Sequence, residues 1–194
     1  MTKIAIFASG SGSNYQAIMD AIKSGSLEAS VELLVCDRED AFVLERAKRE
    51  HTPIFQFDPK RYDSKSDYEK EITNVLYKHQ VEFIVLAGYM RLIGDTLLQK
   101  FTNRIINIHP SLLPSFPGKH AVRQALQAGV KVTGVTVHFV DEGMDTGPII
   151  AQEALKIDKV DTEQTLAEKV HKIEHRLYPE TIQLLLQKNE GVTP

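Results

Sequence analysis

Two polar side chains interrupt an apolar run in the segment RIINIHP, residues 104–110. Asn107 and His109 alternate there with isoleucines. Residues two apart in a β-strand project from the same face, so the amide and the imidazole are expected side by side. Pro110 then keeps His109 in extended geometry. The pair could act together on one bound group, although a strand-end histidine satisfied by backbone groups would have the same pattern.

An acidic loop, DEGMDTGPI (residues 141–149), directly follows the apolar segment Gly134–Val140. It offers three carboxylates, two glycines and a proline. A carboxylate close to His109 would favour the protonated imidazolium, which is a hydrogen-bond donor. Asp145 is the best candidate, because Gly147–Pro148 then redirects the chain. Acidic turns with glycine also simply connect strands, so the spacing leaves both interpretations open.

A loop rich in glycine and serine, SGSGSN (residues 9–14), separates a predicted strand from a predicted helix. Glycine allows tight turns, and the free N–H groups at a helix N-terminus favour an anion. Tyr15 stands where a dinucleotide fingerprint has its third glycine, and no Gly-Lys-Ser/Thr follows as in a P-loop. The loop therefore predicts a phosphomonoester site, unless it is only a turn and a helix cap. Asp37 could hold a ribose, which keeps a nicotinamide enzyme as an alternative, or it belongs to a charged loop.

The segment HKIEH, residues 171–175, has the order of an inverted zinc-protease motif. Its histidines lie one helical turn apart, but a third ligand is not evident, and a solvated helix face is the simpler interpretation. Glu174 could still reach a substrate near the edge of the sheet. His138 lies in VTVHF at strand spacing, which is equally consistent with a core and a surface position.

The composition is that of an ordinary globular domain, with 194 residues of which 42% are hydrophobic and 25% charged. A net charge of -3 and a pI of about 6.2 argue against a nucleic-acid or anionic membrane surface. No apolar run approaches the roughly 18 residues of a membrane span, and the first run is too short for a signal peptide. The single Cys36 excludes an internal disulfide. We expect a cytoplasmic enzyme or binding protein.

The candidate residues need a framework that brings strand ends together. Apolar, β-branched runs alternate with amphipathic segments, which predicts an α/β fold with a doubly wound, mostly parallel sheet and helices on both faces, Rossmann-like in its N-terminal half. Two closely spaced strands near the C-terminus predict an antiparallel pair. The predicted strands are Lys3–Ala8, Val31–Cys36, Pro53–Phe57, Phe83–Tyr89, Arg104–His109, Gly134–Val140 and Pro148–Ile157; the predicted helices are Asn14–Lys23, Asp40–Glu50, Ser66–Lys78, Gly94–Lys100, His120–Ala128 and Thr162–Lys188, the last kinked or divided at Pro179.

Three motifs follow one another along the chain: SGSGSN, NIHPSLLPSFPG and VHFVDEGMDTGPI. Together they resemble the folate-dependent formyltransferases, and the glycine loop and short length resemble the phosphoribosylglycinamide formyltransferase branch of that family. The resemblance covers essentially the whole chain, including VLAGYMRLI (residues 85–93). It implies one formyltransferase domain over residues 1–194, with a phosphate-binding half to about residue 110 and a folate half from about residue 111. It also implies transfer of a formyl group from the cosubstrate 10-formyltetrahydrofolate to glycinamide ribonucleotide in purine synthesis, without a metal.

The resemblance further implies a role for each site residue. Asn107 and protonated His109 would donate hydrogen bonds to the oxyanion that forms when the amine attacks the formyl carbon. Asp145 would keep His109 protonated and, through water, move a proton from the amine to the folate nitrogen. The implied ribonucleotide-binding residues are Gly12, Ser13, Asn14 and Glu174; the implied folate-binding residues are Lys65, Met90, Arg91, Leu92, Ile93, Asn107, Val140, Asp141 and Asp145. Lys65 replaces an arginine of some relatives, so bidentate pairing is lost there.

Four other functions fit parts of the sequence. Formyl transfer to methionyl-tRNA would need a further domain and a basic surface, and a formyltetrahydrofolate hydrolase a regulatory domain; we expect neither. A nicotinamide oxidoreductase is disfavoured by Tyr15, and a non-catalytic nucleotide-binding module leaves Asn107, His109 and Asp145 without a role. We expect small-molecule substrates, no nucleic-acid or membrane partner, and a monomer or a homodimer. The proline-rich turn also raises the question whether Leu113–Pro114 is cis.

Overall fold

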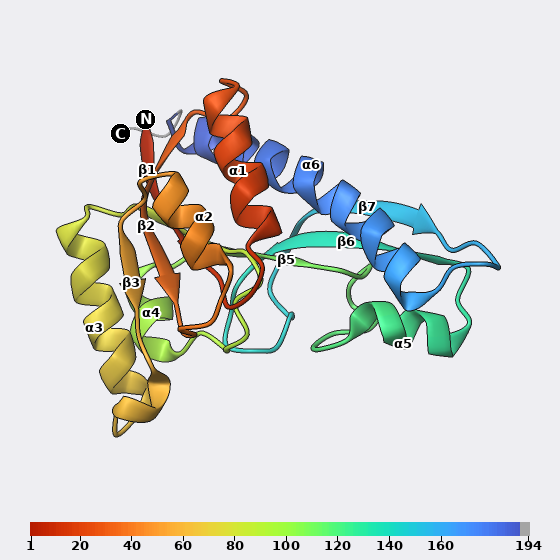
Figure 1. Cartoon of the computed structure of the whole chain (residues 1–194), viewed down its shortest axis with the longest axis horizontal. Helices are drawn as coiled ribbons and strands as arrows, with labels where there is room; N and C mark the ends of the chain where they lie inside the picture. The colour runs from red at the N-terminus through yellow and green to blue at the C-terminus, as the bar shows by residue number, and fades with distance from the viewer. Residues whose placement is uncertain (191–194) are drawn as a thin grey trace.

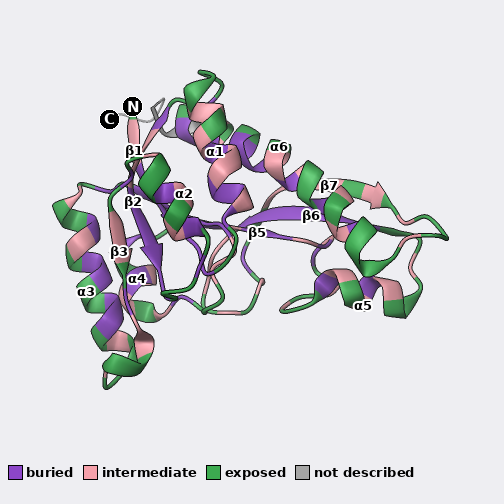
Figure 2. Cartoon of the chain, in the orientation of Figure 1, coloured by how far each residue is buried: buried purple, intermediate pink, exposed green. Residues whose placement is uncertain are grey.

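Apolar residues occupy both faces of the first strand, β1 (Thr2–Phe7), in the computed structural model, which describes residues 1–190. Ile4 and Ile6 point into one hydrophobic core, whereas Ala5 and Phe7 point into a second core on the opposite face. A strand that is apolar on both faces needs cover on both, so helices pack on either side of the sheet (Figure 1). Figure 2 shows the result, with the central strands buried and most helices buried on one side only.

The other elements alternate along the chain much as the sequence predicts. The strands are β2 (Ala29–Cys36), β3 (Ile54–Gln56), β4 (Phe83–Leu86), β5 (Ile105–His109), β6 (Val132–Phe139) and β7 (Ile149–Lys156). The helices are α1 (Ser13–Lys23), α2 (Val43–Arg49), α3 (Lys65–Lys78), α4 (Asp95–Lys100), α5 (Ala121–Ala128) and α6 (Glu163–Glu190), with a 3-10 turn at Pro59–Arg61.

The strands form one sheet in the order β3-β2-β1-β4-β5-β6-β7. Strands β1 to β5 are parallel, and β6 runs antiparallel to both of its neighbours. The predicted fold class, a mostly parallel sheet with an antiparallel pair near the C-terminus, is confirmed. The strand order reverses between β1 and β4, and open α/β sheets bind their ligands beside such a reversal, at the carboxyl ends of the strands.

The two hydrophobic cores show which helices cover which face. Buried residues of α1, α2 and α6 join the core that contains Ile4, and buried residues of α3 and α4 join the core that contains Phe7. Tyr178 of α6 is fully buried, and its hydroxyl lies 2.8 Å from the carbonyl oxygen of Leu86 and 3.2 Å from that of Ile106. These contacts hold the long C-terminal helix against β4 and β5, close to the predicted site residues.

The structure differs from the sequence prediction at two places that matter for the site. Strand β4 ends at Leu86 instead of Tyr89, so residues 87–94 form neither helix nor strand. The closing helix α6 runs through Pro179 as one element, so division, one of the two outcomes predicted there, is wrong. Tertiary packing outweighs the lost hydrogen bond, because Tyr178 and Ile182 on either side of the proline are fully buried.

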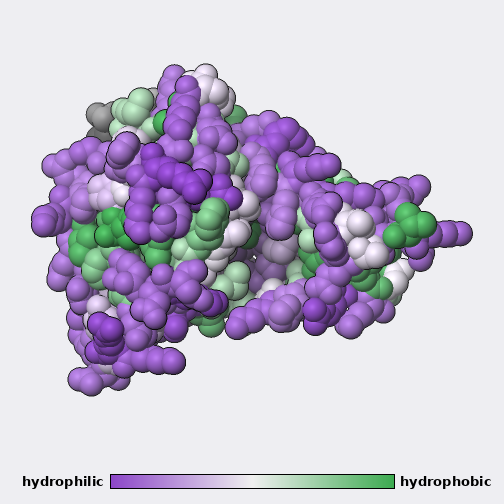
Figure 3. All heavy atoms as spheres, viewed as in Figure 1, coloured by the Kyte–Doolittle hydropathy of each residue, from purple (hydrophilic) through white to green (hydrophobic). Residues whose placement is uncertain are grey.

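Two backbone features shape the loop between β5 and α5. The Leu113–Pro114 peptide is cis, and Phe116 and Gly118 have positive φ values of 54° and 78°. The loop folds back over the end of β5, where the carbonyl oxygen of Phe116 lies 2.8 Å from Nε2 of His109. Figure 3 shows the surface of this face as mostly hydrophilic, with a hollow between the part that carries α1 and α2 and the part that carries α5. Among the described residues, none of the helices has the length and apolar character needed to cross a bilayer.

Candidate active site

Asn107 and His109 lie on the same face of β5, as their spacing predicts, because Ile106 and Ile108 point into the core on the other face. The antiparallel neighbour β6 places His138 opposite Asn107 and Thr136 opposite His109. Nδ2 of Asn107 is 3.3 Å from Nε2 of His138. The pairing of β5 with β6 therefore gathers an amide and two imidazoles at one end of the parallel part of the sheet.

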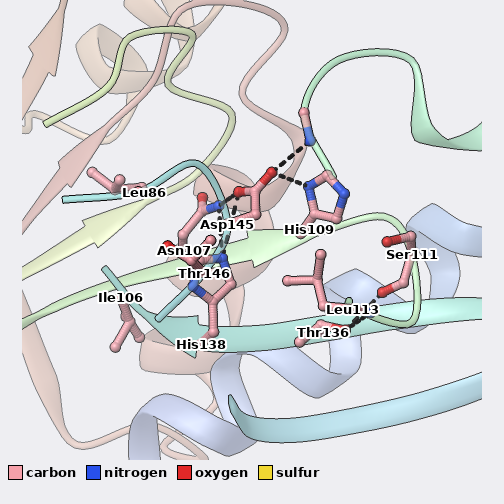
Figure 4. Close-up of polar contacts among 12 residues, drawn as sticks. Leu86, Ile106, Asn107, His109, Ser111, Leu113, Thr136, His138, Asp145 and Thr146 are labelled. Carbon is pink, nitrogen blue, oxygen red and sulfur yellow. Dashed lines mark hydrogen bonds and ion pairs between the residues drawn. The ribbon is translucent and has the colours of Figure 1, made fainter. Parts of the chain in front are cut away.

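Asp145 joins this group from the acidic loop that connects β6 to β7 (Figure 4). Its Oδ2 lies 3.3 Å from Nδ1 of His109, and its Oδ1 lies 3.4 Å from Nδ2 of Asn107. The N–H of Gly118 donates a third contact to Oδ2 at 2.7 Å. Asp145 itself has a positive φ of 57°, a backbone geometry that aspartate tolerates better than most residues. One carboxylate thus links the ends of β5, the loop before α5 and the acidic loop.

Asp141 holds the acidic loop in the shape that delivers Asp145. Its Oδ1 accepts hydrogen bonds from the backbone N–H of Gly143 at 3.0 Å and the hydroxyl of Thr146 at 2.7 Å. The aspartate side chain therefore closes its own turn, as is common for this residue type. Both interpretations of the acidic segment apply, since one aspartate builds the turn and another enters the site.

Both ring nitrogens of His109 face acceptors. Nδ1 faces the Asp145 carboxylate, and Nε2 lies 2.8 Å from the carbonyl oxygen of Phe116. A carbonyl oxygen and a carboxylate can only accept, so the geometry is satisfied when both ring nitrogens carry protons. His109 is also 5% exposed, so water does not compete strongly for these contacts. Both ring nitrogens of His109 are therefore placed to donate, one of them to Asp145.

The environment of Asp145 keeps it charged. Burial alone raises the pKa of the Asp145 carboxyl, but the contact with His138, the Gly118 N–H and the nearby His109 together hold that pKa below its usual value. Asp145 is therefore a carboxylate at neutral pH. His138, only 2% exposed, supports this arrangement with its Nδ1 against its neighbour's carbonyl, that of Phe139, at 2.7 Å. The sequence did not single out His138, because its place opposite Asn107 depends on the register of β6.

The glycine loop lies at another wall of the same site. Gly12 precedes α1 with φ 73°, and a Cβ there would come within 2.5 Å of Cγ2 of Val43 on α2. Both the backbone conformation and the packing therefore require glycine at this position. No side chain caps α1, so its first N–H groups lack intrahelical partners and can receive an anion.

Glu174 of α6 lies inside the molecule, on the inner side of that helix. It is 5% exposed, and its Oε2 accepts a hydrogen bond from Nδ2 of Asn14 at 3.0 Å across 160 residues of sequence. Burial raises the pKa of the Glu174 carboxyl above its usual value, although Asn14 and the neighbouring His171 and His109 favour its charged form. The expected solvated helix face is therefore wrong for Glu174. The rings of His171 and His175 stack 6.1 Å apart; His171 is exposed at the cavity, whereas Nε2 of His175 is buried.

One cavity of about 490 Å³ connects these groups. Every predicted site residue except Lys65 lines it. The lining comes from residues 10–14, 86–93, 107–110, 118–120, 138, 140, 141, 143–145 and two residues of α6, His171 and Glu174. Lys65, the first residue of α3, instead has its Cε beside Gly94. A larger hollow of about 700 Å³ between α1 and α6 touches the site only at Ser13 and contains none of Asn107, His109 and Asp145. We therefore identify the smaller cavity as the candidate active site.

Two predicted alternatives meet obstacles in this geometry. Both carboxylate oxygens of Asp37 are occupied, Oδ1 by the hydroxyl of Ser9 at 2.5 Å and Oδ2 by Nε of Arg91 at 2.7 Å. Asp37 is thus engaged inside the protein and does not line the cavity, which disfavours a ribose contact there. Among the side chains that the structure describes, those of residues 1–187, no three from histidine, cysteine, aspartate or glutamate gather as metal ligands would.

Comparisons with known proteins agree with this geometry. A family model described as formyl transferase matches residues 2–182. Phosphoribosylglycinamide formyltransferase of Bacillus subtilis (strain 168) is 58% identical over 189 residues, which cover 97% of this chain and 97% of that protein. Among solved structures, phosphoribosylglycinamide formyltransferase from Bacillus halodurans matches with a TM-score of 0.95 and 55% identity over 98% of each chain. Glycinamide ribonucleotide transformylase 1 from Geobacillus kaustophilus matches with a TM-score of 0.94 and 57% identity over 96% of this chain and 99% of that one.

Proposed function

This chain belongs to the formyl transferase family and transfers the formyl group of 10-formyltetrahydrofolate to the amine of phosphoribosylglycinamide, and we propose that Asn107, His109 and Asp145 carry out this step. The reaction yields the N-formyl ribonucleotide and tetrahydrofolate in purine biosynthesis. The observation that supports the residue roles is the Asp145 carboxylate, 3.3 Å from His109 and 3.4 Å from Asn107 within the cavity. The carboxylate lies between the two hydrogen-bond donors, His109 and Asn107, and orients both. This arrangement suits a reaction in which an oxyanion forms and then collapses.

The first step is attack of the neutral amine on the formyl carbon. A carbon–nitrogen bond forms, and the carbonyl electrons move to the formyl oxygen, which becomes negatively charged. Preorganised donors stabilise such an oxyanion, and removal of one typically costs about 10²–10³ in rate. We assign this role to Nε2–H of His109 and the amide of Asn107.

Bound substrate must exchange places with internal acceptors for these donors to act. Nε2 of His109 now faces the Phe116 carbonyl oxygen, and Nδ2 of Asn107 faces His138 and Asp145. The formyl oxygen would replace the Phe116 carbonyl at His109 and one partner of the Asn107 amide. The protein therefore keeps the donors oriented before substrate arrives, which reduces the ordering needed in the transition state.

The second step returns the proton. The attacking nitrogen carries an extra proton after the bond forms, and the folate nitrogen needs one when its bond to the formyl carbon breaks. Asp145 is a carboxylate held at the centre of the cluster and can pass this proton through a water molecule. His109 stays protonated throughout because its Nδ1–H remains on Asp145.

The two substrates would occupy opposite ends of the cavity. The phosphate would bind the N–H groups of residues 12–14, and Glu174 would contact the ribose or glycinamide portion. The pterin ring would lie between residues 90–93 and residues 140, 141 and 143–145, all of which line the cavity. Lys65 stays a prediction for the folate tail.

The test is a spectrophotometric assay of the purified protein with both substrates, run beside His109→Asn. Folate deformylation that requires the ribonucleotide and fails in the variant would support the reaction and the residue together. Deformylation without the ribonucleotide would indicate a hydrolase instead. Folded protein with no turnover would contradict the proposal.

The cellular location and the oligomeric state of the protein are also proposals. We propose a cytoplasmic location and either a monomer or a homodimer. Light scattering after gel filtration, at several protein concentrations, would distinguish the two oligomeric states.

A further inference from the structure

The segment between β4 and α4 forms one wall of the active site without regular structure of its own. Residues 87–94 belong to no helix or strand, yet residues 87–93 all line the cavity. Met90 and Leu92 are 62% and 49% exposed, so apolar packing does little to hold them. Ile93 is buried in the core, but the exposed stretch before it needs other contacts, and two buried carboxylates provide contacts at Arg91 and at Gly94.

Asp37 holds the first part of the segment. It lies at the carboxyl end of β2, is 8% exposed, and accepts hydrogen bonds from Ser9 and Arg91. Ser9 is 2% exposed, and its hydroxyl also accepts the backbone N–H of Met90 at 2.9 Å. Because the single hydroxyl proton of Ser9 points to Asp37, its oxygen is free to receive Met90. The carboxylate thus fixes both the backbone of residue 90 and the side chain of residue 91.

Glu69 holds the other end from helix α3. It is 2% exposed, and its Oε1 accepts the backbone N–H of Gly94 at 2.7 Å. Gly94 is the N-cap of α4 and provides no side-chain cap. A Cβ on Gly94 would lie 2.7 Å from Oε2 of Glu69, so only glycine lets the carboxylate approach this closely. A carboxylate from a different helix therefore caps α4 and fixes where the segment ends.

We infer that Asp37 and Glu69 are positioning residues for the formyl donor: they clamp residues 90–94 from both ends and so hold the folate-binding wall in place. The inference rests on the proposed function, which assigns this wall to the pterin ring. Neither carboxylate lines the cavity. The wall contacts the formyl donor equally in the ground state and in the transition state. Loosening the wall therefore weakens binding of both states alike, which raises KM for the donor without lowering kcat.

The main test is Asp37→Ala, measured with each substrate varied in turn. Loss of a charged hydrogen-bond partner typically weakens the dependent contact by about tenfold or more, and we expect that rise in KM for 10-formyltetrahydrofolate. We expect KM for phosphoribosylglycinamide and kcat to stay within about twofold. Asp37→Asn keeps one acceptor for Ser9 but loses the charge that holds Arg91, so its KM should lie between those of the wild type and Asp37→Ala.

A matched control and a second variant keep the inference falsifiable. Asp40→Ala removes an exposed carboxylate from the same connection, where it pairs with Arg38, and should leave both KM values and kcat unchanged. Arg91→Gln removes the other partner; its side chain is 39% exposed, so the fold should survive even if Asp37→Ala does not. Glu69→Gln retains an acceptor for Gly94 and should have a milder effect than Glu69→Ala.

The outcomes separate this inference from the proposed function. Calorimetric titration of wild-type protein with tetrahydrofolate, together with the assay, tests the function itself. If the wild type transfers formyl and folded Asp37→Ala and Arg91→Gln both retain the wild-type donor KM, the clamp is disproved while the function stands. Equal rises in KM for both substrates, or a fall in kcat alone, would also overturn the clamp, since a general loss of structure or a catalytic role would then explain the data.

Discussion

The two ends of the cavity are built in different ways. The proposed phosphate site uses backbone N–H groups of consecutive residues, 12–14, at the start of one helix. The proposed catalytic end depends on side chains, and Asp145 reaches Asn107 from 38 residues away along the chain. Backbone sites tolerate a change of side chain but not of φ. Side-chain sites tolerate changes in local backbone preference but not the loss of one functional group.

This difference predicts that chemistry fails first at the catalytic end. His109→Asn should lower kcat by about 10²–10³, because it removes one oxyanion donor. Binding of phosphoribosylglycinamide, measured by calorimetry, should stay near the wild-type value. His51→Asn is a matched control, since His51 is exposed with a positive φ of 55°, which asparagine adopts readily. Equal loss of binding and turnover in His109→Asn would show that His109 is structural.

Asp145→Asn should have the next largest effect, a loss of about 10² in kcat, because the proton then lacks a base. The variant also tests how the charge of Asp145 makes the stability of the fold depend on pH. Asp145 has a pKa below its usual value in the folded protein, so its charge stabilises the fold above about pH 4 and loses that contribution as the pH falls through the folded pKa. Denaturant unfolding should therefore show the variant less stable than wild type at pH 7, with the gap smaller at pH 3. A gap that is constant with pH would contradict this account.

Gly12→Ala should damage the other end without touching the chemistry. The added Cβ meets Val43, and the positive φ costs about 1–3 kcal/mol in a residue with a side chain. We expect the loop to shift, KM for phosphoribosylglycinamide to rise about tenfold by loss of roughly one hydrogen bond to a charged group, and kcat at saturation to change little. Gly10→Ala is the stability control, because a Cβ there meets no atom within 4 Å. A fall in kcat with unchanged KM would disprove the division between the two ends.

Glu174→Gln should have the smallest effect on stability and the opposite sign. The buried carboxyl of Glu174 has a raised pKa, so the folded protein loses stability as the pH rises from the unfolded value through the folded one. Glutamine removes this loss, so the variant should be more stable relative to wild type at pH 8 than at pH 5. Urea unfolding at both pH values measures the difference. An equal stability difference between Glu174→Gln and wild type at both pH values would contradict the raised pKa of Glu174.

The sequence predicted most of the fold because its signals are local. Apolar runs in β-branched residues marked the strands, and the i, i+2 spacing of Asn107 and His109 placed them on one face. The failures share one physical cause. Pro179 does not divide α6, because burial of the residues beside it outweighs a local preference. The roles of His138 and Asp37 were not decided by the sequence, because the partner of each lies far away along the chain. His138 contacts Asn107, and Asp37 contacts Arg91.

By itself, the amino-acid sequence determined the alternation of elements, the glycine loop and the shared face of Asn107 and His109. These depend on the geometry of strands and helix ends, which a few consecutive residues set. Only the tertiary structure decided that β6 pairs with β5 in the register that brings in His138, that the acidic loop closes on His109, and that Glu174 turns inward to Asn14. Those contacts form only when the two cores bury the faces of the sheet, because the free energy that holds distant segments together comes from that burial and not from the site itself.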